Sequence, residues 1–457
     1  MATGAGAETA GEDPGKTAPE PKFKGLKSML EIPESQWPTY SNFGFDVTYS
    51  DEASMARVGL LKTPHGNIET PAFVFCATKA AVRGVTMETM KQCKTQIILS
   101  NTYHLLVQPG PEAIKRMGGL QRCTRWGGPM LTDSGGYQIF SMGFGSVADE
   151  IKGRRGTEGG DGLGPSLLSI GEKGARFKSY QNGAIHKLTP EISVQIQRSL
   201  GADLILVLDE CTPFHVDKAY TQDSMRRSHR WAMRSLAEFI KGDDGSQALY
   251  GIIQGGTYED LREESTSFCN NNPFFGVAVG GSLGADKQTM YDTVKSTMSN
   301  IRRDRPVHLL GVGGVSDVFF GVRQGIDTFD CVHPTRLGRH GGALVKAGHW
   351  CAGNAGVAKK EHINLDKGRF SDDHRVIDEN CGCPTCKGGY TRAYLHHLGK
   401  AKEIVRTCLL VAHNVWYMNS LFEDIRAAIP KGTLEAVEKE YLPEGLRPSQ
   451  RTAMTLS

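Results

Sequence analysis

Eight short apolar runs recur between residues 71 and 335, and this repetition constrains the fold more than any other feature of the chain. Each run has the length and the nearly continuous hydrophobicity of a strand buried on both faces, and helix-like segments separate the runs. Eight strand–helix units over about 250 residues predict an α/β fold, the (β/α)8 or TIM barrel. An open doubly wound sheet is the alternative, but no run carries the GxGxxG phosphate loop of that fold. The runs are residues 71–78, 95–105, 129–136, 203–213, 249–256, 274–281, 307–314 and 327–335.

Polar or glycine-rich clusters end six of the eight runs. In a barrel the active site is built at the carboxyl ends of the strands, so these clusters are expected to share one pocket. Any single aspartate among them could instead cap the helix that follows. The set as a whole favours a pocket, and its members are Asn101, Asp133, Asp209, Gln254, Gly280, Gly281 and Asp330.

Two aspartates that converge on one pocket permit a double displacement at an acetal-like carbon. One carboxylate attacks and forms a covalent intermediate, while the other moves protons on the leaving and entering groups. Paired carboxylates alone would also fit a glycosidase acting on sugars. The residues by themselves therefore define the chemistry but leave the substrate open.

Three cysteines, Cys381, Cys383 and Cys386, stand within six residues in the sequence CGCPTC. Thiolates at this spacing in a reducing compartment typically hold a tetrahedral Zn²⁺ ion. A fourth ligand is needed, and spacing alone does not choose among His374, His396, His397 and His413. Occupation by four protein ligands would make the zinc structural, with no open position for water.

The rest of the sequence divides the chain into three parts. Residues 1–40 begin with a stretch rich in Ala, Gly, Pro and Glu and are expected to form a disordered tail. Residues 41–345 are expected to form the barrel domain, with a flexible insertion at 143–164, where eight of 22 positions are glycine. Residues 346–457 would hold the zinc-binding subdomain, a closing helix and a C-terminal tail.

The bulk composition excludes some classes of protein. No apolar run approaches the ~20 residues that span a bilayer, and the start lacks the apolar core of a secretory signal. Eleven cysteines without an export signal favour reduced thiols in the cytoplasm or the nucleus. A net charge of +3 neither requires nor excludes nucleic acid, so an RNA-binding role must come from a local patch.

Seven motifs, in order along the chain, resemble those of the tRNA-guanine transglycosylases. The similarity runs from residue 45 to residue 425, and the combination of DSGGYQ, DECTP and FDCxxPTR is specific to that family. The resemblance implies a TIM barrel with a zinc-binding insertion near the C-terminus, in agreement with the pattern of runs. The motifs are SNTYHL (100–105), LTDSGGYQ (131–138), LDECTP (208–213), IIQGG (252–256), VGG (279–281), LLGVGG (309–314) and FDCVHPTRLGRHG (329–341).

The resemblance implies exchange of the wobble guanine of tRNAs with a GUN anticodon, those for Asp, Asn, His and Tyr, for queuine. By its motif Asp330 would be the nucleophile that attacks the ribose C1′, and Asp133 the general acid and base. Asp327, inside the run, is expected to be structural, and Cys331 to serve packing because a thiol has no part in this exchange. The substrate-binding residues implied are Asn101, Ser134, Gly135, Gly136, Tyr137, Asp209, Gln254, Gly281 and Gly284.

The same motifs imply an RNA-binding face and complete the zinc site. Arg336 and Arg339 match positions that contact RNA phosphates near the wobble nucleotide, a task that suits guanidinium groups. A His-Asn pair on the last helix selects His413 as the fourth zinc ligand. The RNA-binding residues implied are Gly311, Val312, Gly313, Gly314, Val315, Ser316, Asp317, Thr335, Arg336, Leu337, Gly338 and Arg339.

One glycine bears on the choice of base. Gly284 occupies the place where bacterial enzymes, which use the smaller base preQ1, carry valine, so its missing side chain would make room for queuine's cyclopentenediol. The resemblance therefore implies the eukaryotic catalytic subunit, which works as a heterodimer with a non-catalytic paralogue. The alternative is that this chain is itself the non-catalytic, tRNA-binding subunit. The presence of Asp133, Asp209, Gln254 and Asp330 favours the catalytic role.

Overall fold

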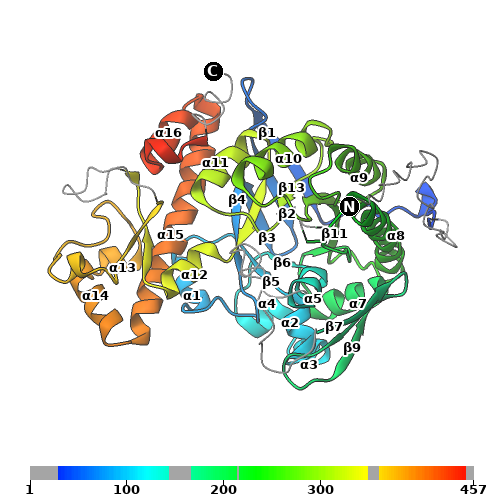
Figure 1. The fold of residues 1–457 in the computed structure, drawn as a ribbon, viewed down its shortest axis with the longest axis horizontal. Helices are drawn as coiled ribbons and strands as arrows, with labels where there is room; N and C mark the ends of the chain where they lie inside the picture. Colours follow the sequence, from blue (N-terminus) through cyan, green and yellow to red (C-terminus); the bar gives the residue numbers. More distant parts are fainter. Residues whose placement is uncertain (1–28, 144–165, 214–215, 348–359, 449–457) are drawn as a thin grey trace, which may run out of the picture.

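The barrel predicted from the eight runs is confirmed in the computed structural model, which describes residues 29–143, 166–213, 216–347 and 360–448. Eight parallel strands close on themselves in the order β10-β11-β12-β13-β14-β4-β5-β6 (Figure 1). The strands are β4 (Ala72–Cys76), β5 (Ile97–Ser100), β6 (Met130–Thr132), β10 (Leu204–Leu206), β11 (Ala248–Ile253), β12 (Gly276–Val279), β13 (Val307–Leu309) and β14 (Thr328–Cys331).

Helices follow the strands around the outside of the barrel, and local sequence fixes where several of them begin. The Thr189 hydroxyl accepts a hydrogen bond from the Ile192 N–H at 3.2 Å and caps α7, as the sequence predicts. The barrel helices are α1 (Met87–Gln92), α2 (Thr102–Val107), α3 (Pro111–Arg116), α4 (Gly119–Thr124), α5 (Gly136–Gly143), α7 (Pro190–Leu200), α8 (Lys218–Lys241), α9 (Glu259–Asn271), α10 (Lys287–Ser299), α11 (Val315–Arg323) and α12 (His333–Arg339).

An antiparallel sheet of β1 (Gly44–Ser50), β2 (Arg57–Thr63) and β3 (Gly66–Thr70) precedes the barrel and is tied to the amino ends of its strands. Arg57 at the start of β2 donates to both carboxylate oxygens of Asp327, at 2.8 and 2.5 Å, and both side chains are buried. His65, in the β2–β3 turn, contacts Asp203 at 2.7 Å, just before β10. Asp327 therefore has a structural partner at the end of the barrel opposite to Asp330.

A second small sheet interrupts the chain between β6 and β10. It consists of β7 (Leu167–Gly171), β8 (Gly174–Lys178) and β9 (Ile185–Leu188), all antiparallel. The glycine-rich insertion expected at 143–164 lies outside the described residues, apart from the last backbone position of α5. The sheet was not predicted from the sequence.

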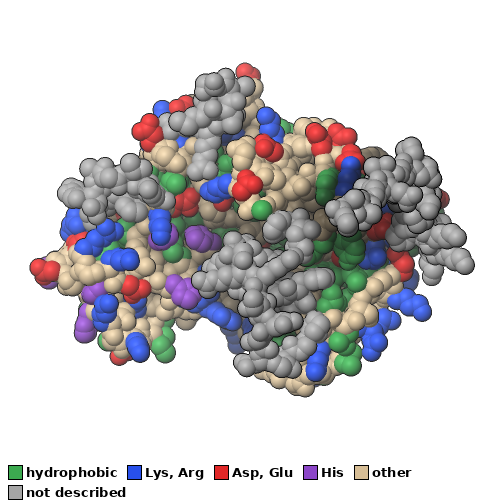
Figure 2. Space-filling model, in the orientation of Figure 1, with side chains coloured by type: hydrophobic (Ala, Val, Ile, Leu, Met, Phe, Trp, Pro, Cys, Tyr) green, Lys and Arg blue, Asp and Glu red, His purple; other side chains and the backbone are tan. Residues whose placement is uncertain are grey.

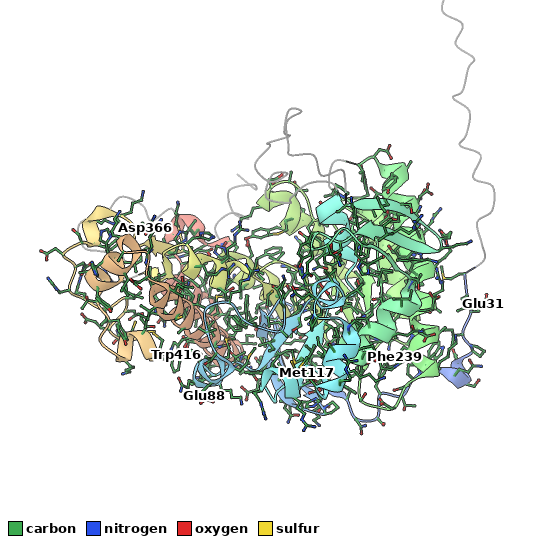
Figure 3. The ribbon with its side chains drawn as sticks, turned by 90° about the horizontal axis from the view of Figure 1, so that it is seen from below. Glu31, Glu88, Met117, Phe239, Asp366 and Trp416 are labelled. Atoms are coloured by element: carbon green, nitrogen blue, oxygen red, sulfur yellow. The ribbon has the colours of Figure 1, made fainter. Side chains whose placement is uncertain are left out.

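The C-terminal part forms a lobe with a core of its own (Figure 1). The long helix α15 packs on one side against the barrel core and on the other against this lobe. In Figure 3, Asp366 and Trp416 mark the lobe side, whereas Met117 and Phe239 mark the barrel. The lobe contains β15 (Gly342–Leu344), β16 (His362–Asn364), α13 (Pro384–Lys387) and α14 (Arg392–Lys400). After α15 (Ile404–Ala428) comes α16 (Leu434–Tyr441), whose Tyr441 packs in the barrel core.

Among the described residues, no helix is both long enough and apolar enough to cross a lipid bilayer.

Candidate active site and metal centre

Asp133 follows β6 and is held by three donors at the carboxyl end of the barrel. Its Oδ2 accepts hydrogen bonds from the Asn101 and Gln138 amides, both at 2.6 Å, and its Oδ1 accepts one from the Thr102 N–H at 2.8 Å. Burial raises the pKa of Asp133 above its usual value, the three donors lower it, and the nearby Asp330 charge raises it again. The net increase suits a group that must hold and release a proton.

Asp209 follows β10 and joins two polar neighbours in the same pocket. Its Oδ1 accepts from the Ser134 hydroxyl at 3.2 Å, and its Oδ2 from the Gln254 amide at 2.6 Å. Burial raises the pKa of Asp209 to about 6, although both donors lower it. A Cβ on Gly281 would lie 2.4 Å from the Gln254 Oε1, and one on Gly136 would lie 2.5 Å from the Asp209 carbonyl oxygen. The two glycines therefore allow the polar groups to pack this closely.

Asp330 ends β14, and its two carboxylate oxygens have different surroundings. Oδ1 is 3.1 Å from the His308 Nε2 and accepts a hydrogen bond from the Gly311 N–H at 3.0 Å. Oδ2 contacts the Cys76 thiol, with Sγ at 3.7 Å. His308 is fully buried on β13 and was missed in the sequence, because a histidine inside an apolar run looked like part of the strand. A weak sequence signal was its place in the run 307–314, which directly precedes the run that carries Asp330.

Cys331 lies beside the proposed nucleophile without the features of a reactive thiol. Burial raises its pKa to about 12, so the thiol stays protonated near neutral pH. Its sulfur accepts a hydrogen bond from the His333 N–H at 3.4 Å, at the first turn of α12. These observations support the packing role expected for Cys331.

Tyr137 stands at the start of α5, next to the glycines of DSGGYQ. Gly135 has a φ of +85°, a conformation that favours glycine, and turns the chain between Asp133 and the helix. Tyr137 itself is 46% exposed, one residue after the glycine that packs against Asp209.

The segment 311–317 lies partly at the surface and partly buried against the C-terminal part of the chain. A hollow of about 530 Å³ beside Cys331 is lined by five residues of the segment, Gly311, Val312, Gly313, Gly314 and Asp317. Val315 and Ser316 are buried, and their N–H groups donate to the Glu361 carboxylate at 2.9 and 3.0 Å. Glu361 was not predicted, because it comes from the C-terminal part of the chain and meets α11 only in the fold.

The five residues 335–339 on α12 face in two directions. Thr335 and Gly338 are buried, and a Cβ at 338 would lie 2.9 Å from the Val411 nitrogen of α15. Arg336 is exposed, and Leu337 and Arg339 are partly exposed. Burial lowers the pKa of Arg339, and the neighbouring charges of Arg83 and Arg336 lower it further, so three guanidinium groups lie near one another.

Gly284 does not support the size argument made from the sequence. Its φ is +117°, and a Cβ there would lie 2.6 Å from the Thr289 Cγ2 at the start of α10. Backbone conformation and contact with α10 therefore already require glycine. The missing side chain would have pointed at α10, so its absence alone does not enlarge the pocket.

Four side chains gather into a buried cluster that could hold a metal ion: Cys381, Cys383, Cys386 and His413. Their ligand atoms all lie within 4.8 Å of one another, and the His413 Nδ1 is 3.4 to 3.7 Å from the three sulfurs. The His413 Nε2 lies 2.8 Å from the Leu344 carbonyl, which orients the ring. Three thiols and an imidazole at these separations fit a closed tetrahedral site. Among the four candidate histidines, the structure brings His413 to the thiols.

A parallel eight-stranded barrel with carboxylates at its strand ends, joined to a lobe whose Cys3His cluster could hold a metal ion, defines a class of barrel enzyme. The family model for queuine tRNA-ribosyltransferase matches residues 51–444. The chain belongs to this family and is a pentosyltransferase.

Three bacterial relatives, each named queuine tRNA-ribosyltransferase, show the extent of the similarity. The protein of Roseiflexus sp. (strain RS-1) is 42% identical over 407 residues, which cover 87% of this chain and 98% of the relative. The protein of Chlamydia pneumoniae is 42% identical over 387 residues, covering 85% and 98%. The protein of Chlamydia muridarum is 40% identical over 385 residues, covering 84% and 98%.

Proposed function

We propose that this protein replaces the wobble guanine of tRNAs with a GUN anticodon by queuine, through a covalent enzyme–tRNA intermediate. Membership of the family supports tRNA and guanine as substrates. The observation that carries the proposal is the meeting of Asp133, Asp209 and Asp330 at one end of the barrel, with amide donors around them. The anticodon class and queuine itself rest on the resemblance of the motifs.

The pocket contains groups suited to hold a purine-like base. The Asp209 carboxylate can accept hydrogen bonds from the ring N–H and the exocyclic amine of guanine, and the Gln254 amide beside it can donate or accept. The Asn101 amide beside Asp133 and the Gly281 backbone beside Gln254 would line the same pocket, and the exposed Tyr137 would stack on the base. Such contacts serve an enzyme that must extract a base from its stack.

In the first half-reaction, an Asp330 oxygen attacks the ribose C1′ as the C1′–N9 bond breaks. The bonding electrons leave with guanine, and protonated Asp133 supplies the proton that the departing base needs. In the second half-reaction the N9 of queuine attacks C1′, the ester bond to Asp330 breaks, and the N9 proton passes to Asp133. Each catalytic group returns to its starting state.

The anticodon backbone would bind across α12 and the neighbouring hollow. Arg336 and Arg339, joined by Arg83, provide guanidinium groups for phosphate oxygens. Among the RNA-binding residues taken from the motifs, the proposal gives direct RNA contacts to the residues that line the hollow or are exposed on α12, and a positioning role to the four buried ones. The first group is Gly311, Val312, Gly313, Gly314, Asp317, Arg336, Leu337 and Arg339, and the second is Val315, Ser316, Thr335 and Gly338. Figure 2 shows further Lys, Arg and His side chains over the C-terminal lobe.

The Cys3His cluster is assigned to zinc, which would cross-link the lobe to α15 and take no part in the base exchange. Thiolate ligands need a reducing compartment, so we place the protein in the cytoplasm or the nucleus. The proposal includes a heterodimer with a non-catalytic paralogue. It also includes the division of the chain into three parts at residues 40 and 345. The alternative is a non-catalytic tRNA-binding subunit, in which the complete set of carboxylates would have no catalytic role.

Incorporation of radiolabelled guanine tests the proposal. The purified protein is incubated with a GUN-anticodon tRNA, with and without a candidate partner, and with the same tRNA in which the wobble guanine is adenine as the control. We expect label only in the first tRNA. Asp330→Asn should abolish both the label and the denaturation-resistant protein–RNA band, whereas the exposed Asp292→Asn should retain both. Absence of label in all conditions would overturn the catalytic role.

A further inference from the structure

The Asp330 carboxylate is held asymmetrically, and this asymmetry identifies a residue that the motifs do not contain. Both well-formed contacts, to the His308 Nε2 and the Gly311 N–H, go to Oδ1, while Oδ2 has the 3.7 Å contact to the Cys76 thiol. We propose that His308 is a positioning residue that fixes Oδ1 so that Oδ2 is the attacking oxygen. The inference rests on the proposed function of Asp330 as the nucleophile.

A residue paired across two neighbouring strands fixes the histidine ring. His308 on β13 pairs in register with Thr328 on β14, and the His308 Nδ1 lies 2.9 Å from the Thr328 hydroxyl. His308 is fully buried, so its ring has no room to turn toward solvent. A carboxylate oxygen only accepts, so the Nε2 must carry the hydrogen that faces Asp330. Thr328 can then donate to the Nδ1 of a neutral ring, which keeps the hydrogen on Nε2.

The other oxygen, Oδ2, lies beside the Cys76 thiol. Burial raises the pKa of the Cys76 thiol well above its usual value, and the charges of Asp330 and Asp133 are among the groups that raise it further. Cys76 therefore stays a thiol, a weak donor that leaves most of the electron density of Oδ2 available. Because the charges of both carboxylates act on Cys76, the inference assigns Oδ2 to the side of Asp330 nearer to Asp133, where the proton of the base is handled.

The hydrogen bond between the His308 Nε2 and the Asp330 Oδ1 also affects the stability of the covalent intermediate. When Oδ2 bonds to C1′, Oδ1 becomes the carbonyl oxygen of a neutral ester, and the electron pair of the C1′–N9 bond leaves with the base. When the ester breaks, the electron pair of the C1′–O bond returns to Asp330 and restores the anion. A hydrogen bond to an anion is about twice as strong as one to a neutral acceptor. His308 therefore favours the free carboxylate over the ester, and its loss should make the adduct persist.

Quenched-flow measurement of adduct and turnover tests this inference. For His308→Phe, which keeps a ring and removes the donor, we expect guanine exchange to slow on the order of 10- to 100-fold. The ratio of covalent adduct to free tRNA at fixed guanine should rise roughly 5- to 20-fold. His308→Gln, whose amide can reach the place of Nε2, should restore turnover and ratio to within about 3-fold of wild type.

Two comparisons separate positioning from general damage. His396→Phe makes the same change at another buried histidine, whose Nδ1 contacts the Leu365 carbonyl at 2.7 Å in the C-terminal lobe. It should lower the melting temperature without changing the adduct ratio. If His308→Phe does not fold, the comparison of His308→Gln with His308→Asn separates positioning from general damage, because only the glutamine amide reaches the Nε2 position.

The outcomes distinguish this inference from the proposed function. Slower turnover with an unchanged adduct ratio, equal behaviour of His308→Gln and His308→Asn, or a shifted ratio in His396→Phe would each overturn the positioning role. A wild-type protein that forms adduct while His308→Phe behaves as wild type would also reject it and leave Asp330 in place. A wild-type protein that forms neither adduct nor exchanged tRNA would reject the proposed function instead.

Discussion

Buried carboxyl groups at the strand ends carry a cost in stability that their surroundings only partly offset. Asp209 is the clearest case, because burial raises its pKa to about 6 even though Ser134 and Gln254 donate to it. The folded state therefore binds a proton at Asp209 more tightly than the unfolded chain does. A group of this kind stabilises the fold below its unfolded pKa, and that contribution is lost as the pH rises through the folded pKa.

We expect Asp209→Asn to stabilise the protein at pH 7.5 by about 2 kcal/mol relative to its effect at pH 4.5. The reason is that the neutral amide avoids the desolvation that the carboxylate suffers above pH 6. Urea unfolding at the two pH values measures the difference, with the exposed Asp292→Asn as the control. A stability difference that does not depend on pH would contradict the raised pKa. The same variant should lose base exchange, because the carboxylate is the proposed acceptor for the base.

Gly284 gives a second prediction at the scale of a residue. Gly284→Val adds strain at a φ of +117° and a clash with Thr289, so we expect lower stability and slower use of guanine and queuine alike. Relative kcat/KM values for the two bases should stay within about 3-fold of wild type. Thr289→Ala combined with Gly284→Ala removes part of the clash and should recover part of the stability. A loss confined to queuine would restore the size argument made from the sequence.

At the scale of elements, the sequence predicted what local patterns determine and missed what long-range contacts determine. All eight barrel strands were located, because strands buried on both faces are continuously apolar. The β1–β3 sheet was missed because β1 is largely exposed and β2 alternates between buried and partly exposed positions, so neither gives a continuous apolar run. Asp133, Asp209 and Asp330 were found because strand ends form the pocket of a barrel. His308 and Glu361 were missed because their partners become neighbours only through the fold.

The ion pair between Arg57 of β2 and Asp327, directly before β14, gives a prediction for the β1–β3 sheet. Arg57→Met leaves the Asp327 carboxylate buried without its cation, so we expect a loss of about 3–5 kcal/mol in the free energy of unfolding. The double variant Arg57→Met/Asp327→Leu should recover a substantial part, because no charge is then left buried. Urea denaturation of the four proteins gives the coupling energy. Strictly additive losses would show that the two side chains do not stabilise each other.

At the scale of the whole molecule, α15 connects the two cores. It packs against the barrel through residues such as Val415 and Met418, and against α12, which carries Arg336 and Arg339. The same helix brings His413 to the three cysteines of the lobe. The Cys3His cluster and the proposed RNA-binding face on α12 are therefore both held in place by α15. Loss of the metal should therefore affect RNA binding without any metal–RNA contact.

Metal removal tests this connection. A chelator should lower the melting temperature and release zinc, measurable by a colorimetric indicator, because an empty Cys3His cluster no longer links the lobe to α15. We expect tRNA affinity to fall on the order of 10-fold, as α12 loses its fixed support, while Cys381→Ser reproduces the effect without chelator. Cys408→Ser, at an exposed position on the same helix, is the matched control and should behave as wild type. If zinc leaves and the melting temperature and tRNA affinity both stay unchanged, the lobe is held by its apolar core alone, through residues such as Ile363, Phe370 and Leu395.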